Sequence, residues 1–239
     1  MKRTGRVQKG ASMSDLNAAP FNPLPPVVWA LALPIIAMEV VLSAAGAGLV
    51  GGAEGIGWRA QAWERFAFSP DYMRAQMALG DWSGDVVMRL FTYPLVHLNP
   101  THAIFVTVFL LALGKMVGEV FRWWAVLAVF FGAGLAGAAA YTAIPAIHAP
   151  LIGGYPPVYG LIGAFTFLLW TRLASTGASQ YRAFALIGAL MGIQLLFGVI
   201  FGAGWDWVAE LAGFAAGFVL SFLVSPGGWS RVLAKMRNR

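Results

Sequence analysis

The chain has 239 residues, of which 59% are hydrophobic and 11% are charged. Its mean hydropathy is +0.71. Long apolar runs with few charges are typical of membrane spans, so the composition excludes an ordinary soluble domain. The chain has no cysteine, which excludes disulfides and thiolate metal sites. Its net charge of +6 gathers in the tails and in short loops, which indicates cytoplasmic loops of a membrane protein rather than nucleic-acid binding.

The first segment, residues 1–26, predicts a cytoplasmic N-terminal tail. It carries four basic residues and ends in Pro25 and Pro26. The apolar run that follows is too long for the core of a signal peptide, so we expect a retained span. Translation could begin at Met1 or at Met13, and the sequence leaves both open.

Six apolar segments follow, which predict an all-α polytopic membrane protein with a six-helix membrane domain over residues 27–225. An open sheet would leave backbone groups unpaired in lipid, whereas helices pair their own. The fourth segment is short for a span of about 20 residues. The predicted spans are Val27–Val50, Ala103–Phe121, Trp124–Ile144, Pro157–Thr171, Ala183–Phe201 and Trp207–Val224.

The basic residues predict the orientation of these spans. With six spans, both tails, Arg122 and the basic loop 172–182 fall on one side, which should be the cytoplasm. Residues 226–239 then form a basic cytoplasmic tail, and the charges favour a bacterial inner membrane. The long segment 51–102 lies outside and mixes aromatic with charged residues, which predicts short amphipathic helices at the membrane interface. A plain surface loop is the alternative.

Three stretches resemble the rhomboid family of intramembrane serine proteases. They are "RLFTYPLVHLNPTHAIF" (Arg89 to Phe105), "GGYPPVYGLIGA" (Gly153 to Ala164) and "AELAGFAAGF" (Ala209 to Phe218). The resemblance covers about residues 27–225. It implies a rhomboid-like bundle of six transmembrane helices with a long external first loop, and a site at which a serine on the fourth span meets a histidine on the last.

The residues at the active positions differ from the family pattern. Aligning "GLIGA" places Tyr155 where the nucleophilic serine belongs and Pro156 on the glycine after it. Glu210 stands at the position of the catalytic histidine, and Val106 at the asparagine of the oxyanion site. The family's two histidines on the second span are matched by His97 and His102.

These replacements predict that the proteolytic chemistry is lost. A tyrosine hydroxyl has a pKa of about 10, and a carboxylate does not readily hand a proton to a leaving amine. Val106 donates no hydrogen bond, and losing one oxyanion donor costs about 10²–10³ in rate. Ser175 and Ser179 lie in the cytoplasmic loop, so neither is expected to replace the nucleophile.

Metal chemistry is not predicted either. His97 and His102 are five residues apart, which does not place them on one helix face, and His148 lies in a loop beside a proline. We therefore predict no metal and no cofactor.

Packing residues surround the altered positions. Gly153 and Gly154 form the turn, and Pro156 and Pro157 suit the first positions of a helix, with Tyr155 just outside it. A second set, Gly160, Gly213 and Gly217, gives small faces that let the fourth and last helices approach closely.

Two acidic residues share one face of the last span, because Asp206 and Glu210 are four residues apart. If the family packing holds, the Tyr155 hydroxyl reaches the Glu210 carboxyl directly or through one water. The alternative is that Glu210 reaches external water. Glu39 in the first span has no evident partner, and we expect a hydrogen bond within the bundle.

The resemblance implies a role as well as a fold. Inactive members of the superfamily bind, escort or dislocate membrane clients, so we predict a pseudoprotease whose partners are the lipid bilayer and transmembrane helices of client proteins, and not nucleic acid. Two alternatives stay open. One is an intramembrane serine-type endopeptidase with a rebuilt site, and the other is a structural subunit of a larger membrane complex.

Overall fold

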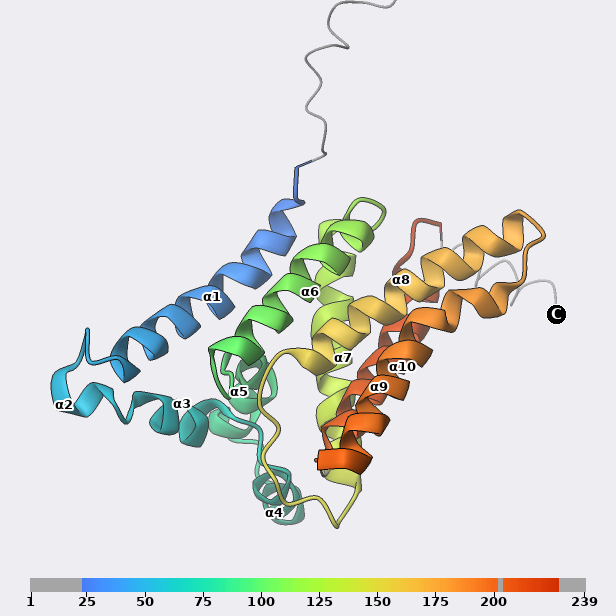
Figure 1. Cartoon of the computed structure of the whole chain (residues 1–239). Helices are drawn as coiled ribbons and strands as arrows, with labels where there is room; N and C mark the ends of the chain where they lie inside the picture. The colour runs from blue at the N-terminus through green and yellow to red at the C-terminus, as the bar shows by residue number, and fades with distance from the viewer. Residues whose placement is uncertain (1–22, 202–203, 228–239) are drawn as a thin grey trace, which may run out of the picture.

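The structure is a computed structural model that describes residues 23–201 and 204–227 (Figure 1). Over these ranges the fold is helical, and one isolated β-bridge joins Phe68 to Leu151. The long helices are α1 (Pro26–Gly46), α6 (Pro100–Gly118), α7 (Trp123–Ala143), α8 (Tyr155–Ser175), α9 (Ala185–Phe201) and α10 (Asp206–Val224). The short ones are α2 (Gly52–Gly55), α3 (Trp58–Phe66), α4 (Pro70–Leu79), α5 (Gly84–Thr92) and the 3₁₀ turns η2 (Tyr93–Leu95) and η3 (Gln180–Phe184).

The predicted class, an all-α polytopic membrane protein, is confirmed. Five described helices, α1, α6, α7, α8 and α10, are long and apolar enough to cross a membrane. Helix α9 has 17 residues, at the lower end of the range of about 17–25 that spans require. The sixth span therefore stays a prediction.

The expectation of a short fourth span was wrong. Helix α8 has 21 residues and begins at Tyr155, so this tyrosine is the first helical residue and not the one before it. The apolar pattern does not indicate this start, because the first turn contains two prolines and prolines usually interrupt helices. They are tolerated in the first turn, where the backbone N–H groups have no partner within the helix. Over the described residues, the shortest of the long helices is α9.

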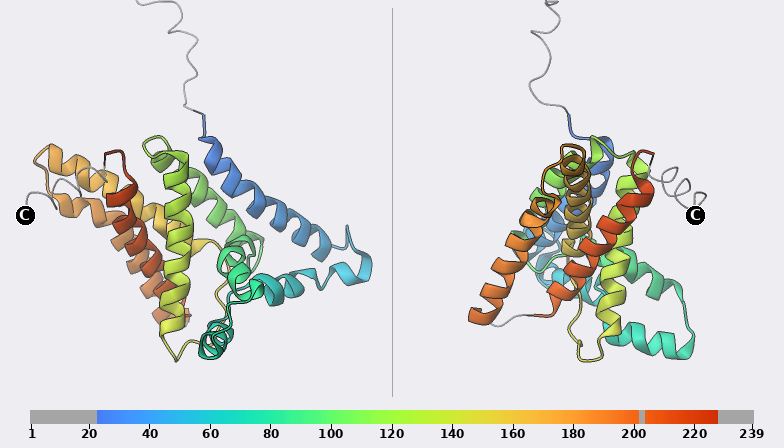
Figure 2. Two further views of the ribbon diagram at one scale, coloured as in Figure 1. Left: turned by 180° about the vertical axis from the view of Figure 1, so that it is seen from behind. Right: turned by 90° about the vertical axis from the view of Figure 1, so that its right-hand side faces the viewer.

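The first half of α8 forms the centre of the bundle. Every residue from Pro156 to Ala164 is buried. Helix α10 packs along α8 and α7, while α1 packs on α6. From behind, α7 stands between α10 and the short helices α4 and α5 (Figure 2, left). The largest hydrophobic cluster joins α1, α6, α7 and α8, so the start of α8 is held on several sides.

The segment between α1 and α6 is folded against the bundle rather than looping freely. The Arg74 guanidinium on α4 donates to the carbonyl of Thr142 in the last turn of α7 (3.0 Å) and to that of Ile147 in the loop after it (2.6 Å). Phe68 and Leu151 exchange two backbone hydrogen bonds of 3.1 and 2.8 Å. The segment thus holds four short helices, as the amphipathic pattern predicts, and its placement at the membrane interface stays a prediction.

Candidate functional site

Two glycines shape the turn that precedes α8. Gly153 has a φ of +101°, a conformation that other residues rarely adopt, and a Cβ on it would lie 2.6 Å from the His102 ring. A Cβ on Gly154 would lie 2.8 Å from Val106. The Gly153 N–H donates to the Tyr93 carbonyl at 3.0 Å. The turn is therefore pressed so closely against α6 that side chains at these two positions would collide with it.

His97 supports the same turn. Its side chain is 1% exposed, and its Nε2 accepts a hydrogen bond from the Gly154 N–H at 3.4 Å. Burial lowers the pKa of His97 to about 4, so the ring is neutral near pH 7 and can act as an acceptor. Its carbonyl oxygen accepts from the Arg59 guanidinium (3.0 Å) and from the Trp63 indole (3.1 Å).

An ion pair holds Arg59 in this position. Its guanidinium donates to both carboxylate oxygens of Glu39 on α1, at 2.6 and 3.0 Å. The Ser43 hydroxyl donates to the same carboxylate at 2.5 Å. The expectation that Glu39 bonds within the bundle was incomplete, because its main partner, Arg59, comes from the segment between α1 and α6. Helices α1 and α3 are thereby tied to the turn through His97.

Aromatic rings pack together at Tyr155, the first residue of α8. The Tyr155 ring stacks on His102, with centroids 4.9 Å apart and planes 22° apart. His102 in turn meets His97 edge-on at 5.2 Å. Val106 is fully buried one turn further along α6 and presents only methyl groups. The start of α8 is thus covered by a stack of rings and by the methyl groups of Val106.

Glu210 lies one turn into α10 and is 4% exposed. With Tyr155 it lines two cavities, of about 510 Å³ on the side of the 149–152 loop and about 320 Å³ between α6, α8, α9 and α10. The predicted link between the Tyr155 hydroxyl and the Glu210 carboxyl, directly or through one water, stays a prediction. Tyr159, one turn further along α8, interacts with the Glu210 carboxyl.

Two further tyrosines therefore belong to the site. Tyr159 could have been found from the sequence, because it lies four residues after Tyr155 and so on the same face of α8. Tyr141 on α7 gave no such signal. Its hydroxyl donates to the Asp206 carboxylate at 3.3 Å, and both line the larger cavity. Asp206 and Glu210 thus face the same cavity, as their spacing predicts.

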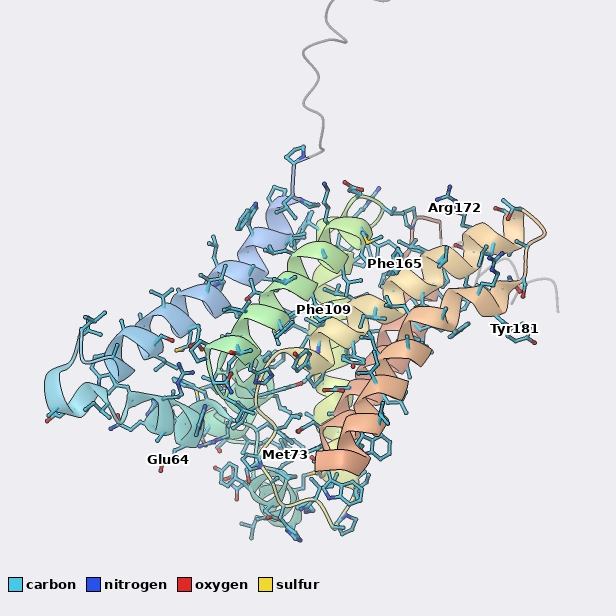
Figure 3. All side chains as sticks on the ribbon, in the orientation of Figure 1. Glu64, Met73, Phe109, Phe165, Arg172 and Tyr181 are labelled. Atoms are coloured by element: carbon cyan, nitrogen blue, oxygen red, sulfur yellow. The ribbon has the colours of Figure 1, made fainter. Side chains whose placement is uncertain are left out.

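The smaller cavity is mostly apolar. Apart from the two tyrosines and Glu210, its wall is made of aliphatic and phenyl side chains, including Phe109 of α6 and Leu190 and Ile193 of α9. Phe109 lies on the side of α6 that faces α8 (Figure 3). The cavity is thus lined by α6, α8, α9 and α10.

Glycines set the distance between the two helices that carry Tyr155 and Glu210. A Cβ on Gly217 would overlap the Gly160 carbonyl, and one on Gly213 would overlap the Pro156 carbonyl. Pro157, beside this crossing, packs against α7 at Gly134. The backbones of α8 and α10 are therefore in direct contact, which places Glu210 beside the first turn of α8.

The two serines considered as alternative nucleophiles lie at the far end of α8 and after it. Ser175 ends α8, about 30 Å along the helix from Tyr155, and its hydroxyl donates to the Arg172 carbonyl at 2.8 Å. Ser179 follows this helix in the turn before η3. Among the described residues, no group of three histidine, cysteine or acidic side chains could hold a metal ion.

Comparison with protein families agrees with this geometry. The rhomboid domain model matches residues 84–227, which is more than half of the chain and runs from α5 through α10. The chain belongs to the rhomboid family. This confirms the resemblance seen in the three motifs, and with the apolar helices it makes the protein an integral membrane protein. A search of curated proteins finds no match.

We expect this rhomboid-family protein to lose stability as the pH falls from about 6.5 to about 4. The folded state keeps His97 neutral down to about pH 4, whereas the unfolded chain takes up its proton near pH 6.5. Between these values the unfolded state binds more protons, so the free energy of unfolding drops with falling pH, by on the order of 3 kcal/mol in total. Denaturant unfolding in mild detergent at a series of pH values measures this.

The variant His97→Asn tests the assignment, because an amide oxygen can still accept from the Gly154 N–H. It should flatten the pH dependence between about pH 6.5 and about pH 4. A curve that keeps its slope in His97→Asn would show that other groups cause it.

Proposed function

We propose that this rhomboid-family protein binds transmembrane helices of client proteins without cleaving them. The observation that carries the proposal is the position of Tyr155 and Glu210 on the shared wall of the two cavities, where the resemblance implies a serine and a histidine. A phenol and a carboxylate do not form a nucleophile and base pair near pH 7. Val106 adds no oxyanion donor. The altered residues remove the chemistry while the cavities remain.

The smaller cavity supports the binding half of the proposal. Its apolar wall includes Phe109, Leu190 and Ile193, and Tyr155 and Glu210 add polar groups to the lining. A client helix bound at this cavity would meet both apolar side chains and polar groups. Polar contacts favour helix association in a bilayer, where apolar burial alone gives little.

A crosslinking residue at Ile193 tests this proposal. We expect it to trap intact membrane proteins through their transmembrane helices, identified by mass spectrometry of the adduct. The same residue at Val40, exposed on α1, is the matched control and should trap only lipid. A shortened client would favour the alternative of a rebuilt endopeptidase. One partner captured at both positions in fixed stoichiometry would favour the structural subunit.

We expect no hydrolysis of transmembrane reporter substrates and no labelling by serine-directed fluorophosphonates. Tyr155→Ser combined with Glu210→His should stay inactive, because Pro156 and Val106 still alter the turn and the oxyanion site. Gel-based labelling and a cleavage assay in vesicles measure both. Labelling that disappears in Ser175→Ala would reveal a nucleophile elsewhere in the chain.

The orientation in the membrane is also part of the proposal. We place both termini in the cytoplasm and the segment 51–102 outside, in a bacterial inner membrane, because the basic residues then share one side. Reporter fusions after Arg239 and near Asp71 should report opposite sides. Reporters on the same side would mean that α9 does not cross.

A further inference from the structure

A third cavity lies on another face of α7, away from Tyr155 and Glu210. It has a volume of about 480 Å³ and separates α4 and α5 from the last turns of α7. Met73, Met77 and Trp82 line it from the external segment, and Leu135, Ala139 and Ala143 line it from α7. Met73 lies low in the molecule, at α4 (Figure 3). The two walls are held together beside the cavity by the bonds of Arg74 to the end of α7.

The polar groups in this wall are already bonded. The Arg74 guanidinium donates to Asp71 at 2.7 Å as well as to the backbone carbonyls of α7 and the residues after it. The Thr142 hydroxyl donates to the Ala138 carbonyl at 2.8 Å. A sugar, nucleotide or anion would therefore be buried here with few partners, which costs free energy, whereas a hydrocarbon needs none.

The cavity opens beside exposed apolar side chains. It lies beside the last turns of a membrane span, and two of its wall residues, Met77 and Trp82, are 51% and 59% exposed. Leu79, between them in the chain, is 77% exposed. Exposed apolar side chains at the end of a span are typical of contact with the outer part of a bilayer. The cavity is too small for a protein helix, because about 480 Å³ corresponds to about one turn of a helix of 10–12 Å diameter.

We propose that one acyl chain of a membrane phospholipid occupies this cavity and fastens the external segment to α7. The lipid comes from the leaflet that adjoins the end of α7 at Ala143. Its chain lies between the methionines of α4 and the small residues of α7, and its headgroup stays outside near the exposed Trp82. This inference does not depend on whether the protein binds or cleaves clients.

Photolabelling by lipid tests the proposal. The full chain is reconstituted in vesicles of palmitoyl-oleoyl phosphatidylcholine, and a small share of the lipid molecules carries a photoreactive group in the middle of one acyl chain. After irradiation, mass spectrometry maps the modified residues. We expect the residues 135–143 and 73–82 to be labelled several-fold more than the equally lipid-facing residues around Ala37 of α1. Ala139→Leu fills the cavity from an exposed position and should lower labelling of residues 73–82 to the level at α1.

Two further variants make the result decisive. Ala143→Leu fills the same cavity one turn later and should act like Ala139→Leu. Ala37→Leu makes the same change on the exposed face of α1 and should leave labelling of the cavity unchanged. Labelling at the level of α1 in the unaltered chain, or labelling that persists in both filled variants, would overturn the proposal. Crosslinks between two copies through the residues 73–82 would also overturn it.

Discussion

Replacing Arg59 by alanine should destabilise the protein by about 3–5 kcal/mol, the range found when one partner of a buried ion pair is removed. The pair is mostly shielded from solvent, since the side chains of Arg59 and Glu39 are 18% and 11% exposed. Without the guanidinium, the carboxylate would stay in the second half of α1 with only the Ser43 hydroxyl as a donor. The His97 carbonyl would lose one of its two donors.

Unfolding in a mixed detergent titration measures the effect, and two controls identify its cause. Arg65→Ala removes an exposed arginine from the same helix and should change stability by less than about 0.5 kcal/mol. The double variant Arg59→Met with Glu39→Leu removes both charges and should cost less than Arg59→Ala alone, because no unpaired carboxylate remains. Equal losses for Arg59→Ala and Arg65→Ala would contradict the buried-pair account.

This ion pair also connects the site to α1, which lines neither of the two cavities at Tyr155 and Glu210. Glu39 binds Arg59, Arg59 holds the carbonyl of His97, and the His97 ring accepts from the turn at Gly154. Each bond joins a different element, so α1, α3 and the turn before α8 form one connected support. A change in α1 should therefore alter the turn that precedes Tyr155 even though α1 lines neither of its two cavities.

The sequence alone predicted the parts of this site that follow from local chemistry. Glycines at a tight turn, prolines in a first helical turn and two acidic residues four apart each leave a pattern within a few positions. The partner of Glu39 could not be predicted in that way, because Arg59 lies 20 residues further on in another helix. The same holds for Tyr141 and Asp206, which meet only because α7 and α10 pack together.

The length of α8 shows a second limit of prediction from the sequence. Hydropathy placed its start at Pro157, because the first turn contains residues that lower the apolar average. The structure begins the helix at Tyr155, and it continues to Ser175. A rule based on apolar runs finds the membrane-crossing part of a helix well, but it does not find ends that are set by backbone geometry.

Gly217→Ala should separate α8 from α10 and cost at least about 1–3 kcal/mol, the usual penalty for overpacking. A Cβ on Gly217 would overlap the carbonyl, the carbonyl carbon and the Cα of Gly160, which are backbone atoms that cannot turn aside. Helix α8 cannot relieve this overlap by moving toward α7. A Cβ on Gly160 would overlap Ala133 of α7, so the three helices are already in contact at Gly160.

The matched control is Gly188→Ala, the same change in a helical glycine of α9 with nothing within 4 Å of the added Cβ. Alanine is favoured over glycine within a helix by about 0.5–1 kcal/mol, so this variant should be neutral or slightly more stable. Gly217→Ala should therefore lower the free energy of unfolding in detergent while Gly188→Ala does not. It should also draw Glu210 away from Tyr159, because the two residues lie on the helices that the new methyl group pushes apart. Equal stability of the two variants would mean that the crossing of α8 and α10 is looser than the close approach of Gly160 and Gly217 requires.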